Sequence, residues 1–233
     1  RRPRKLSPKE MAAENARLQA EHVEHTLRLA KSKQRRTREA LPAAKKKGEI
    51  VDLLAKARVL IIGGGTGCGK TTQVPQYILE HLLASGRGAG CNIVCTQPRR
   101  LAAIGVAERV AWERQEQLPP ANGGGSGGRD AALVGYQIRL ERRACAATRL
   151  LFCTTGILLR RLQEDPNLEG VSHVIVDEVH ERSLECDFLL ILLRQLLKRR
   201  ASLQVLLMSA TLENGLFESY FREHEPATVT IPG

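Results

Sequence analysis

A glycine-rich loop that ends in lysine and threonine has the clearest chemistry in this sequence. From Gly64 the spacing is G-x-x-x-x-G-K-T, which matches a phosphate-binding loop. Glycines in such a loop let backbone N–H groups point at a polyphosphate, and the N-terminus of the following helix favours negative charge. Lys70 would reach the β- and γ-phosphates, and the Thr71 hydroxyl would hold Mg²⁺. The residues expected to surround a nucleoside triphosphate are Gly64, Gly65, Thr66, Gly67, Cys68, Gly69, Lys70, Thr71 and Thr72.

Two adjacent carboxylates would complete such a site. The apolar run at 173–176 is followed directly by Asp177 and Glu178. In a nucleotide-binding sheet, Asp177 would hold Mg²⁺, and Glu178 would orient and polarise the attacking water. Each pattern also has a plainer interpretation: a glycine-rich turn with a solvated lysine, and an ordinary polar turn. Because both occur in one chain, each after an apolar run, we favour the nucleotide site.

These groups need a scaffold of alternating strands and helices. Strands are predicted at 59–62, 92–96, 134–138, 150–153, 173–176, 203–209 and 228–231. Helices are predicted at 70–83, 100–114, 156–162, 188–198 and 214–221. Buried strands interleaved with helices favour an α/β fold, in which a mostly parallel sheet is covered by helices on both faces. Residues 119–129 are low in complexity and are interpreted as a flexible insertion.

The first 47 residues differ from the rest in charge. They contain 15 lysines and arginines and 5 acidic residues, a net charge of +10 out of the total of +11. The run Ser7-Pro8-Lys9-Glu10 is typical of a helix start, and a polar helix is predicted from there to about Arg36. Residues 1–47 are therefore interpreted as a basic, largely helical extension before a domain at 48–233. Its basic end either contacts phosphates or only adds solubility.

Composition excludes several other classes of protein. With 42% hydrophobic residues in 233, a sizeable core is expected. No apolar run reaches the length of a membrane span, and residues 1–30 lack the apolar centre of a signal peptide. Cys91 and Cys95 suggest a metal site, but no further Cys or His pair completes four ligands, so no structural zinc is expected. Reduced intracellular thiols are predicted instead for Cys68, Cys91, Cys95, Cys145, Cys153 and Cys186.

Six motifs, in order along residues 38–233, resemble the first RecA-like domain of a DEAH/RHA-type RNA helicase, a branch of helicase superfamily 2. They are the loop at 64–72 with its continuation at 73–76, Thr96-Gln97-Pro98-Arg99-Arg100 with 106–111, the block at 134–139, the block at 153–159, Asp177-Glu178-Val179-His180-Glu181-Arg182, and Ser209-Ala210-Thr211. The resemblance implies a single RecA-like P-loop NTPase domain that binds ATP with Mg²⁺. It also implies RNA, single-stranded or structured, as the partner.

The resemblance implies further roles for individual residues. The positions that grip the sugar-phosphate backbone of RNA are matched by Arg99, Arg100, Thr154, Thr155 and Gly156. Arg109 matches a position that stacks on the nucleotide base. Without this motif context, the three arginines would be interpreted as a basic helix face. The positions that link the nucleotide state to the grip on RNA are matched by His180, Ser209 and Thr211.

Three departures from the family pattern affect what we expect. Gly65 stands where the family usually has glutamate, which predicts a looser loop, and Val179 stands where the family name has alanine. The sequence ends at Gly233, about where the family's second RecA-like domain would begin. That domain supplies arginine fingers worth about 10³–10⁵ in rate, so this chain alone is expected to bind ATP and hydrolyse it weakly. A chain that begins at Arg1 is expected to be a fragment.

Two alternatives to an RNA helicase stay open at this stage. One is an RNA-binding or scaffold protein whose nucleotide domain is degenerate and does not hydrolyse ATP. The presence together of Lys70, Thr71, Asp177 and Glu178 disfavours it. The other is an enzyme of the same class that acts on DNA. The protein is expected inside the cell, in the nucleus or the cytoplasm.

Overall fold

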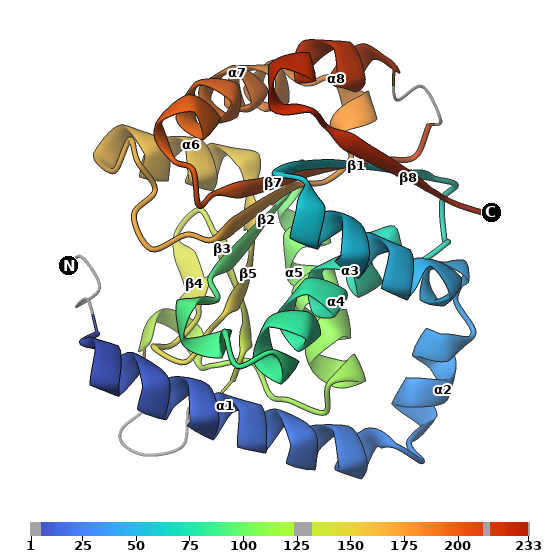
Figure 1. Ribbon diagram of the computed structural model, residues 1–233, viewed down its shortest axis with the longest axis vertical. Helices are drawn as coiled ribbons and strands as arrows, with labels where there is room; N and C mark the ends of the chain where they lie inside the picture. The colour runs from blue at the N-terminus through green and yellow to red at the C-terminus, as the bar shows by residue number, and fades with distance from the viewer. Residues whose placement is uncertain (1–5, 124–131, 212–214, 233) are drawn as a thin grey trace.

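The computed structural model describes residues 6–123, 132–211 and 215–232, which form an eight-stranded sheet between two layers of helices (Figure 1). The strand order is β4-β3-β5-β2-β6-β7-β1-β8, and every neighbouring pair is parallel except β3 with β4. The strands are β1 (Val59–Gly64), β2 (Ile93–Gln97), β3 (Val134–Ile138), β4 (Glu141–Arg143), β5 (Leu150–Thr154), β6 (His173–Val176), β7 (Gln204–Ser209) and β8 (Ala227–Ile231). The predicted α/β fold with a mostly parallel sheet is confirmed.

Each face of the sheet has its own hydrophobic core because successive side chains of a strand point to opposite faces. In β1, Leu60 and Ile62 belong to one core, and Val59 and Ile61 belong to the other. The first core packs against α3 (Lys47–Lys56), α4 (Lys70–Ala84) and α5 (Arg100–Glu113). The second packs against α6 (Thr155–Glu164), α7 (Leu184–Arg199) and α8 (Gly215–Tyr220). The two layers lie on opposite sides of the sheet in Figure 1.

The seven predicted strands are all present, and the strand that sequence reasoning missed is β4. It has three residues, all charged and none fully buried, and it pairs with β3 at the edge of the sheet. A short polar edge strand has no apolar pattern by which it could be recognised. The predicted helix at 188–198 begins earlier, at Leu184, because the Ser183 hydroxyl accepts a hydrogen bond from the amide of Cys186.

Two other predictions fall partly on residues outside the description. Of the predicted loop at 119–129, residues 124–129 lie outside the described part of the chain, and Ala121–Gly123 forms a short 3-10 turn. The helix predicted at 214–221 corresponds to α8, and its first residue, Asn214, is not described. The six cysteines all lie within the described residues, and none of them forms a disulfide bond. Among the described residues, no helix is long and apolar enough to cross a membrane. Within the same residues, no cluster of three or more His, Cys, Asp or Glu side chains could hold a metal ion.

The N-terminal helix begins where the sequence predicts and ends earlier. α1 (Pro8–Leu29) has the complete capping box between Ser7 and Glu10. The prediction that it continues to about Arg36 is wrong, because the Ser32 hydroxyl accepts a hydrogen bond from the Arg35 amide and begins a new helix, α2 (Lys33–Glu39). A 3-10 helix, η1 (Pro42–Lys46), then leads directly into α3.

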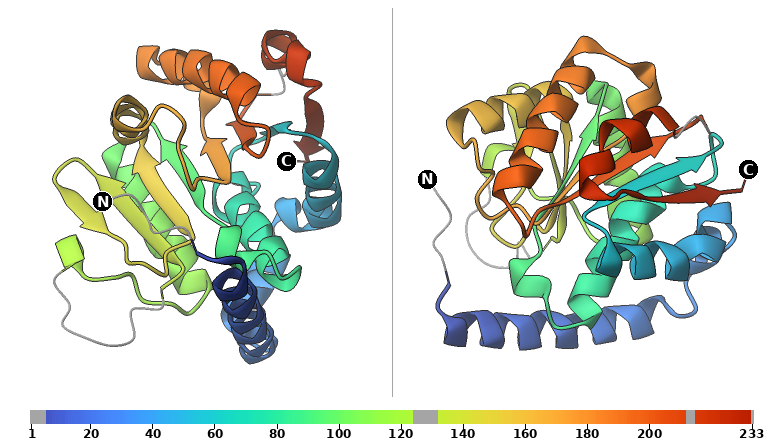
Figure 2. Two further views of the ribbon diagram at one scale, coloured as in Figure 1. Left: turned by 60° about the vertical axis from the view of Figure 1, so that its left-hand side comes forward. Right: turned by 45° about the horizontal axis from the view of Figure 1, so that its top comes forward.

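Residues 1–47 were interpreted as an extension, yet α1 packs on the domain along most of its length. It lies beside α4, on the same side of the sheet in all views of Figures 1 and 2. Its inward residues recur at alternating steps of four and three; they are Met11, Asn15, Leu18, His22, His25 and Leu29. Half of these are polar, which explains why the sequence shows no apolar face. Asn15 accepts a hydrogen bond from the Ala89 amide, and Leu18 is 3% exposed.

We expect acidification to loosen the packing of α1. His22 and His25 are half-buried, and His25 donates a hydrogen bond to the carbonyl oxygen of Arg114. Burial lowers the pKa of both histidines below the ordinary 6.5, and the charge of Arg114 lowers it further. The other charged groups that act on them are Glu80, Lys47, Glu116 and Arg28. At acid pH the unfolded chain binds more protons at these histidines than the folded chain does. The contribution of the neutral histidines to the stability of the fold is therefore complete above pH 6.5 and is lost as the pH falls from 6.5 through the lower pKa of the folded state.

Hydrogen exchange of the α1 amides at about pH 7.5 and about pH 5.5, corrected for intrinsic rates, measures this effect. Protection of α1 should decrease at the lower pH, while protection of β1 and β6 should not. A variant with both His22→Gln and His25→Gln should show no such difference. Equal protection of α1 at both pH values in the unmodified protein would contradict the expectation.

Candidate functional site

The phosphate loop joins β1 to α4 in a conformation that depends on glycine. Gly67 has φ +82° and Gly69 has φ +96°, a region that residues with a side chain rarely adopt. No side chain caps the N-terminus of α4, so its first backbone N–H groups are available to an anion. The Lys70 ammonium, only 6% exposed, donates hydrogen bonds to the carbonyl oxygens of Gly64 and Gly65. It is thereby held over the loop.

Asp177, directly after β6, lies against the phosphate loop. Its Oδ2 accepts hydrogen bonds from the Thr71 hydroxyl at 2.7 Å and the Gln97 amide at 2.8 Å, and its Oδ1 accepts from the Glu178 amide at 2.9 Å. Burial raises the pKa of Asp177, although these hydrogen bonds oppose the rise. A hydroxyl and a buried carboxylate in contact are oxygen donors of the kind that Mg²⁺ prefers. Thr71 and Asp177, the two predicted metal ligands, therefore fit that ion.

Glu178 follows in a left-handed backbone conformation, with φ +55°. Such strain in a residue other than glycine is often found at functional sites. The turn places the Glu178 side chain in the same pocket as Thr71, and 34% of it remains exposed. Burial raises the pKa of Glu178, and the neighbouring charge of Asp177 raises it further. A carboxylate with a raised pKa is a better proton acceptor once it is ionised.

The predicted coupling residues take part in two neighbouring sets of hydrogen bonds. The Ala210 amide, at the end of β7, donates to His180 Nδ1 at 3.1 Å. Because a backbone N–H can only donate, this nitrogen is the acceptor, and its 3.4 Å approach to Glu178 Oε2 is not a hydrogen bond in that tautomer. The Thr211 amide donates to the Ser209 hydroxyl at 3.2 Å, and the two hydroxyls are 3.0 Å apart. The segment after β7 is therefore in direct contact with the acidic motif.

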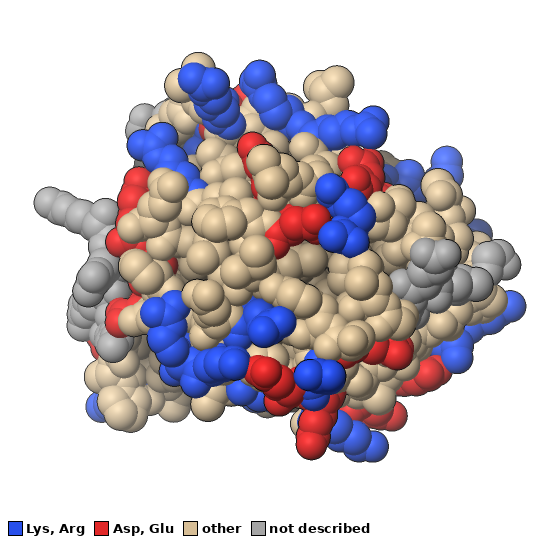
Figure 3. Space-filling view, turned by 90° about the horizontal axis from the view of Figure 1, so that it is seen from above, with Lys and Arg blue, Asp and Glu red and all other residues tan. Residues whose placement is uncertain are grey.

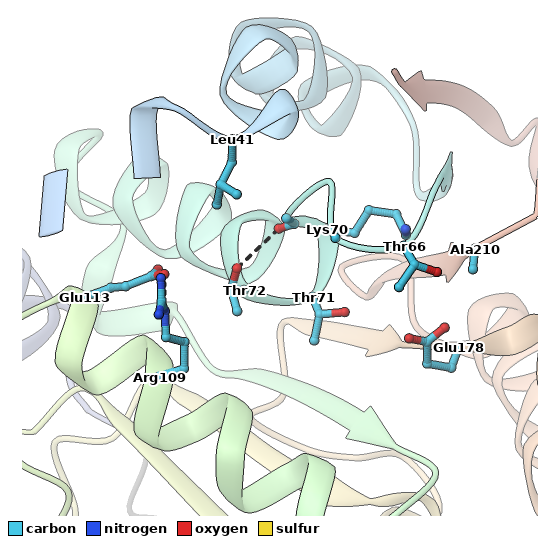
Figure 4. A pocket seen from close by; sticks show the side chains of 11 residues that line it. Leu41, Thr66, Lys70, Thr71, Thr72, Arg109, Glu113, Glu178 and Ala210 are labelled. Carbon is cyan, nitrogen blue, oxygen red and sulfur yellow. Dashed lines mark hydrogen bonds and ion pairs between the residues drawn. The ribbon is translucent and has the colours of Figure 1, made fainter. Parts of the chain in front are cut away.

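These groups surround a pocket of about 370 Å³ (Figure 4). Its lining is Leu41, Thr66, Gly67, Gly69, Lys70, Thr71, Thr72, Arg109, Glu113, Glu178 and Ala210. Three predicted nucleotide residues do not line it: Gly64 and Gly65 supply the carbonyl groups that hold Lys70, and Cys68 is buried behind the loop. Sequence reasoning did not find Leu41, Glu113 or Ala210.

Arg109 reaches the pocket from α5 and is held by two neighbours on its own helix. Its Nε donates to Glu113 Oε1 at 2.8 Å, and its guanidinium carbon is 4.8 Å from the centre of the Trp112 ring. Glu113 is completely buried, whereas 45% of the Arg109 side chain is exposed. The sequence signal for Glu113 was its position four residues after Arg109, a spacing that brings helical side chains together. No such spacing marks the contact of Gln97 with Asp177, which depends on the adjacency of β2 and β6 in the folded sheet.

The residues predicted to grip RNA lie together at the carboxyl ends of two adjacent strands. β2 and β5 pair in a register that puts Gln97 beside Thr154. α5 begins after Arg99, and α6 begins after Thr154, so two helix N-termini lie at this edge. Arg99 and Arg100 are exposed, and Arg99 forms an ion pair with Glu181 at 3.2 Å. Thr155 is buried, and Gly156 is partly exposed.

The opposite layer offers less to a nucleic acid. Seen from the side of α6, α7 and α8, the surface carries its lysine and arginine side chains mainly toward the margins, with acidic side chains between them (Figure 3). A hollow there is lined by Ile191, Arg194, Gln195, Lys198, Arg199 and Tyr220. Arg194 stacks on Tyr220, and Lys198 pairs with Glu223, so two of the three cations that line this hollow already have protein partners.

Comparisons with known proteins agree with this geometry. Residues 39–218 match the DEAD/DEAH box helicase family. The DExH-box ATP-dependent RNA helicase DExH1 of Arabidopsis thaliana is 54% identical over 196 residues, which are 84% of this chain and 18% of that protein. The putative ATP-dependent RNA helicase DHX57 of Homo sapiens is 53% identical over 84% of this chain and 13% of its own. The ATP-dependent RNA helicase DHX29 of Homo sapiens is 54% identical over 79% and 13%, respectively. The chain thus spans less than a fifth of these relatives.

Proposed function

Because this chain belongs to the DEAD/DEAH box helicase family, we propose that it is the ATP-binding domain of an ATP-dependent RNA helicase. The observation that supports this most is that Lys70, Thr71 and Glu178 line one pocket, while Asp177 accepts a hydrogen bond from the Thr71 hydroxyl directly beside it. The names of the relatives support RNA as the substrate.

The phosphates of ATP would bind at the N-terminus of α4. There the backbone N–H groups of the first turn would donate to phosphate oxygens, and the Lys70 ammonium would exchange the carbonyl oxygens of Gly64 and Gly65 for phosphate oxygens. Thr71 and Asp177 would hold Mg²⁺, which when bound offsets the charge of the β- and γ-oxygens. Glu178 would accept a proton from the attacking water and hold that water in line with the γ-phosphate. Arg109 would lie against the base.

The RNA backbone would bind at the edge formed by Arg99, Arg100 and the Thr154–Gly156 turn. Its phosphates would meet exposed guanidinium groups and a helix N-terminus, which are sequence-independent contacts. The Ala210–His180 hydrogen bond would transmit the state of the nucleotide to the segment after β7. We further propose that a second RecA-like domain closes over the pocket and that the protein works inside the cell, in the nucleus or the cytoplasm.

ATP turnover by the longest natural chain that carries this domain tests the proposal. It should be measured alone, with single-stranded RNA and with single-stranded DNA of the same sequence. We expect RNA to stimulate turnover most. A double Arg99→Ala, Arg100→Ala variant should need more RNA for half-maximal stimulation and should show a weaker salt dependence, because it loses phosphate contacts.

Two results would contradict this proposal. ATP binding without turnover under every condition would favour the non-hydrolysing scaffold. Equal or greater stimulation by DNA would favour an enzyme that acts on DNA.

A further inference from the structure

We propose that the segment Arg38–Leu41, at the end of α2, forms the base-binding end of the nucleotide pocket. Leu41 would contact the base, and Arg38 would act as a positioning residue for Arg109. This inference rests on the proposed function, because it takes a nucleoside triphosphate as the ligand. It gives the N-terminal segment a part in ATP binding, whereas its basic end was expected to contact phosphates or only to add solubility.

The pocket has two chemically different ends (Figure 4). At one end lie Thr66, Glu178 and Ala210, around the groups suited to a polyphosphate and its metal. At the other end Leu41 and Arg109 lie on either side of Thr72. An apolar side chain facing a guanidinium fits a flat heteroaromatic ring, because the guanidinium can stack on the ring face and the leucine can cover apolar ring atoms.

Leu41 packs directly against the phosphate loop. A Cβ added at Gly69 would meet Leu41 Cδ1 at 3.0 Å, so the leucine packs on the loop backbone with no space between them. Two residues later, the Ala43 amide donates a hydrogen bond to the carbonyl oxygen of Cys68 at 3.0 Å. Leu41 is therefore held at a defined place relative to the loop that would bind the phosphates.

Arg38 is connected to Arg109 through two completely buried side chains. Arg38 Nε donates to Gln73 Oε1 at 2.8 Å. Gln73 Nε2 donates to Glu113 Oε2 at 2.7 Å, and the other Glu113 oxygen accepts from Arg109 at 2.8 Å. Gln73 and Glu113 are both 0% exposed. The guanidinium that faces the base is thus held by a carboxylate whose own position depends on Gln73.

Arg38 fixes which way the Gln73 amide points. Arginine has only donors, so the Gln73 oxygen must face Arg38 and the NH₂ group must face Glu113. Without Arg38 the buried Gln73 oxygen would lose its donor, and the Glu113 carboxylate would lose the charge of Arg38, whose Nε lies 3.9 Å from Glu113 Oε2. Glu113 would then be less well held, and Arg109 with it. A second buried donor, Gln76 Nε2, also contacts Glu113 Oε2 at 2.7 Å and limits the effect.

Arg38 is itself anchored by an ion pair. Its Nη2 is 2.7 Å from Glu80 Oε1, and Lys47 Nζ is 2.7 Å from the other Glu80 oxygen. Burial would raise the pKa of Glu80, but Arg38 and Lys47 outweigh it and lower this pKa to about 2. Only 13% of the Arg38 side chain is exposed. The charge of Arg38 is therefore neutralised by an ion pair inside the protein and is not presented to solvent.

Calorimetric binding of ATP and of inorganic triphosphate, each with Mg²⁺, to the whole chain tests the inference. Triphosphate has no base, so it reports on the loop alone. We expect Leu41→Ala to raise the Kd for ATP about 5- to 10-fold and to leave the Kd for triphosphate within about 2-fold. Leu41→Met, which keeps the apolar volume, should bind ATP nearly normally.

Arg38→Gln should also weaken the binding of ATP and leave the binding of triphosphate unchanged. Arg38→Lys should recover part of the lost ATP affinity, because lysine restores one hydrogen-bond donor and the positive charge. Arg35→Gln is the matched control: it removes the same charge from α2, but among the described residues the Arg35 side chain forms its ion pair only with Glu39, at the surface. Thermal melting should verify that each variant is folded.

Two outcomes would overturn the inference alone: unchanged ATP binding in Leu41→Ala, or an equal loss of ATP and triphosphate in both variants. The equal loss would mean that the segment only supports the loop. If the unmodified chain bound neither ligand, the proposed function would fail together with this inference.

Discussion

Glu178→Gln should reduce RNA-stimulated ATP turnover by roughly 10²–10⁴-fold while ATP binding stays nearly unchanged. The amide has the shape of the carboxylate but cannot accept the proton of the attacking water. The side chain lines the pocket, and no hydrogen bond joins it to the described residues of the phosphate loop, so affinity should change little when its charge is removed. Steady-state turnover and calorimetric ATP binding measure the two quantities separately.

The matched control is Glu164→Gln, which removes the same charge from an exposed position on α6. It should leave turnover unchanged. A Glu178→Gln protein that still hydrolyses ATP at a rate within about threefold of the unmodified protein would contradict the role assigned to Glu178.

The same residue predicts a dependence on pH. Burial and Asp177 raise the pKa of Glu178 above the ordinary 4.5, and only its ionised form can accept a proton. Turnover should therefore fall as the pH falls through this raised value. The residual turnover of the Glu178→Gln variant should not show this decrease at acid pH. If its turnover fell with the same midpoint, the decrease would have to come from another titrating group.

Lys70→Ala should weaken ATP binding by roughly 10²-fold or more, and inorganic triphosphate by a similar factor. The ammonium is buried beside the loop, and each charge-assisted hydrogen bond that it would make to a phosphate oxygen contributes about 1.5–3 kcal/mol. Calorimetry with both ligands measures this. The equal loss for the two ligands distinguishes Lys70 from Leu41, which should affect ATP alone.

Lys56→Ala, at the exposed end of α3, is the control for loss of a lysine and should bind normally. Because Lys70 also satisfies the carbonyl groups of Gly64 and Gly65, its removal is expected to reduce stability as well. Thermal melting separates this effect from binding. Normal ATP affinity in a folded Lys70→Ala protein would contradict the proposal that the phosphate loop binds ATP.

The elements that the sequence predicts well are those with strong local patterns. Buried parallel strands such as β1 and β6 are continuous apolar runs, and the capping box at Ser7 is complete within four residues. Elements without such a pattern were missed or misplaced. β4 is polar, and Ser32 divides a run that otherwise continues as a single helix. The packing of α1 was missed because polar residues such as Asn15 and His25 face the domain.

The amino-acid sequence by itself determined the family and the α/β fold, and it predicted the two halves of the candidate nucleotide site. The reason is that the phosphate loop and the Asp177-Glu178 pair are each contiguous, with chemistry contained in a few neighbouring residues. Only the tertiary structure decided that Leu41, from the N-terminal segment, lines the same pocket. Arg38, Gln73 and Glu113 are 35 and 40 residues apart in turn and are joined by hydrogen bonds between polar side chains. Such contacts have neither periodicity nor spacing, so they become visible only when packing brings α2, α4 and α5 together.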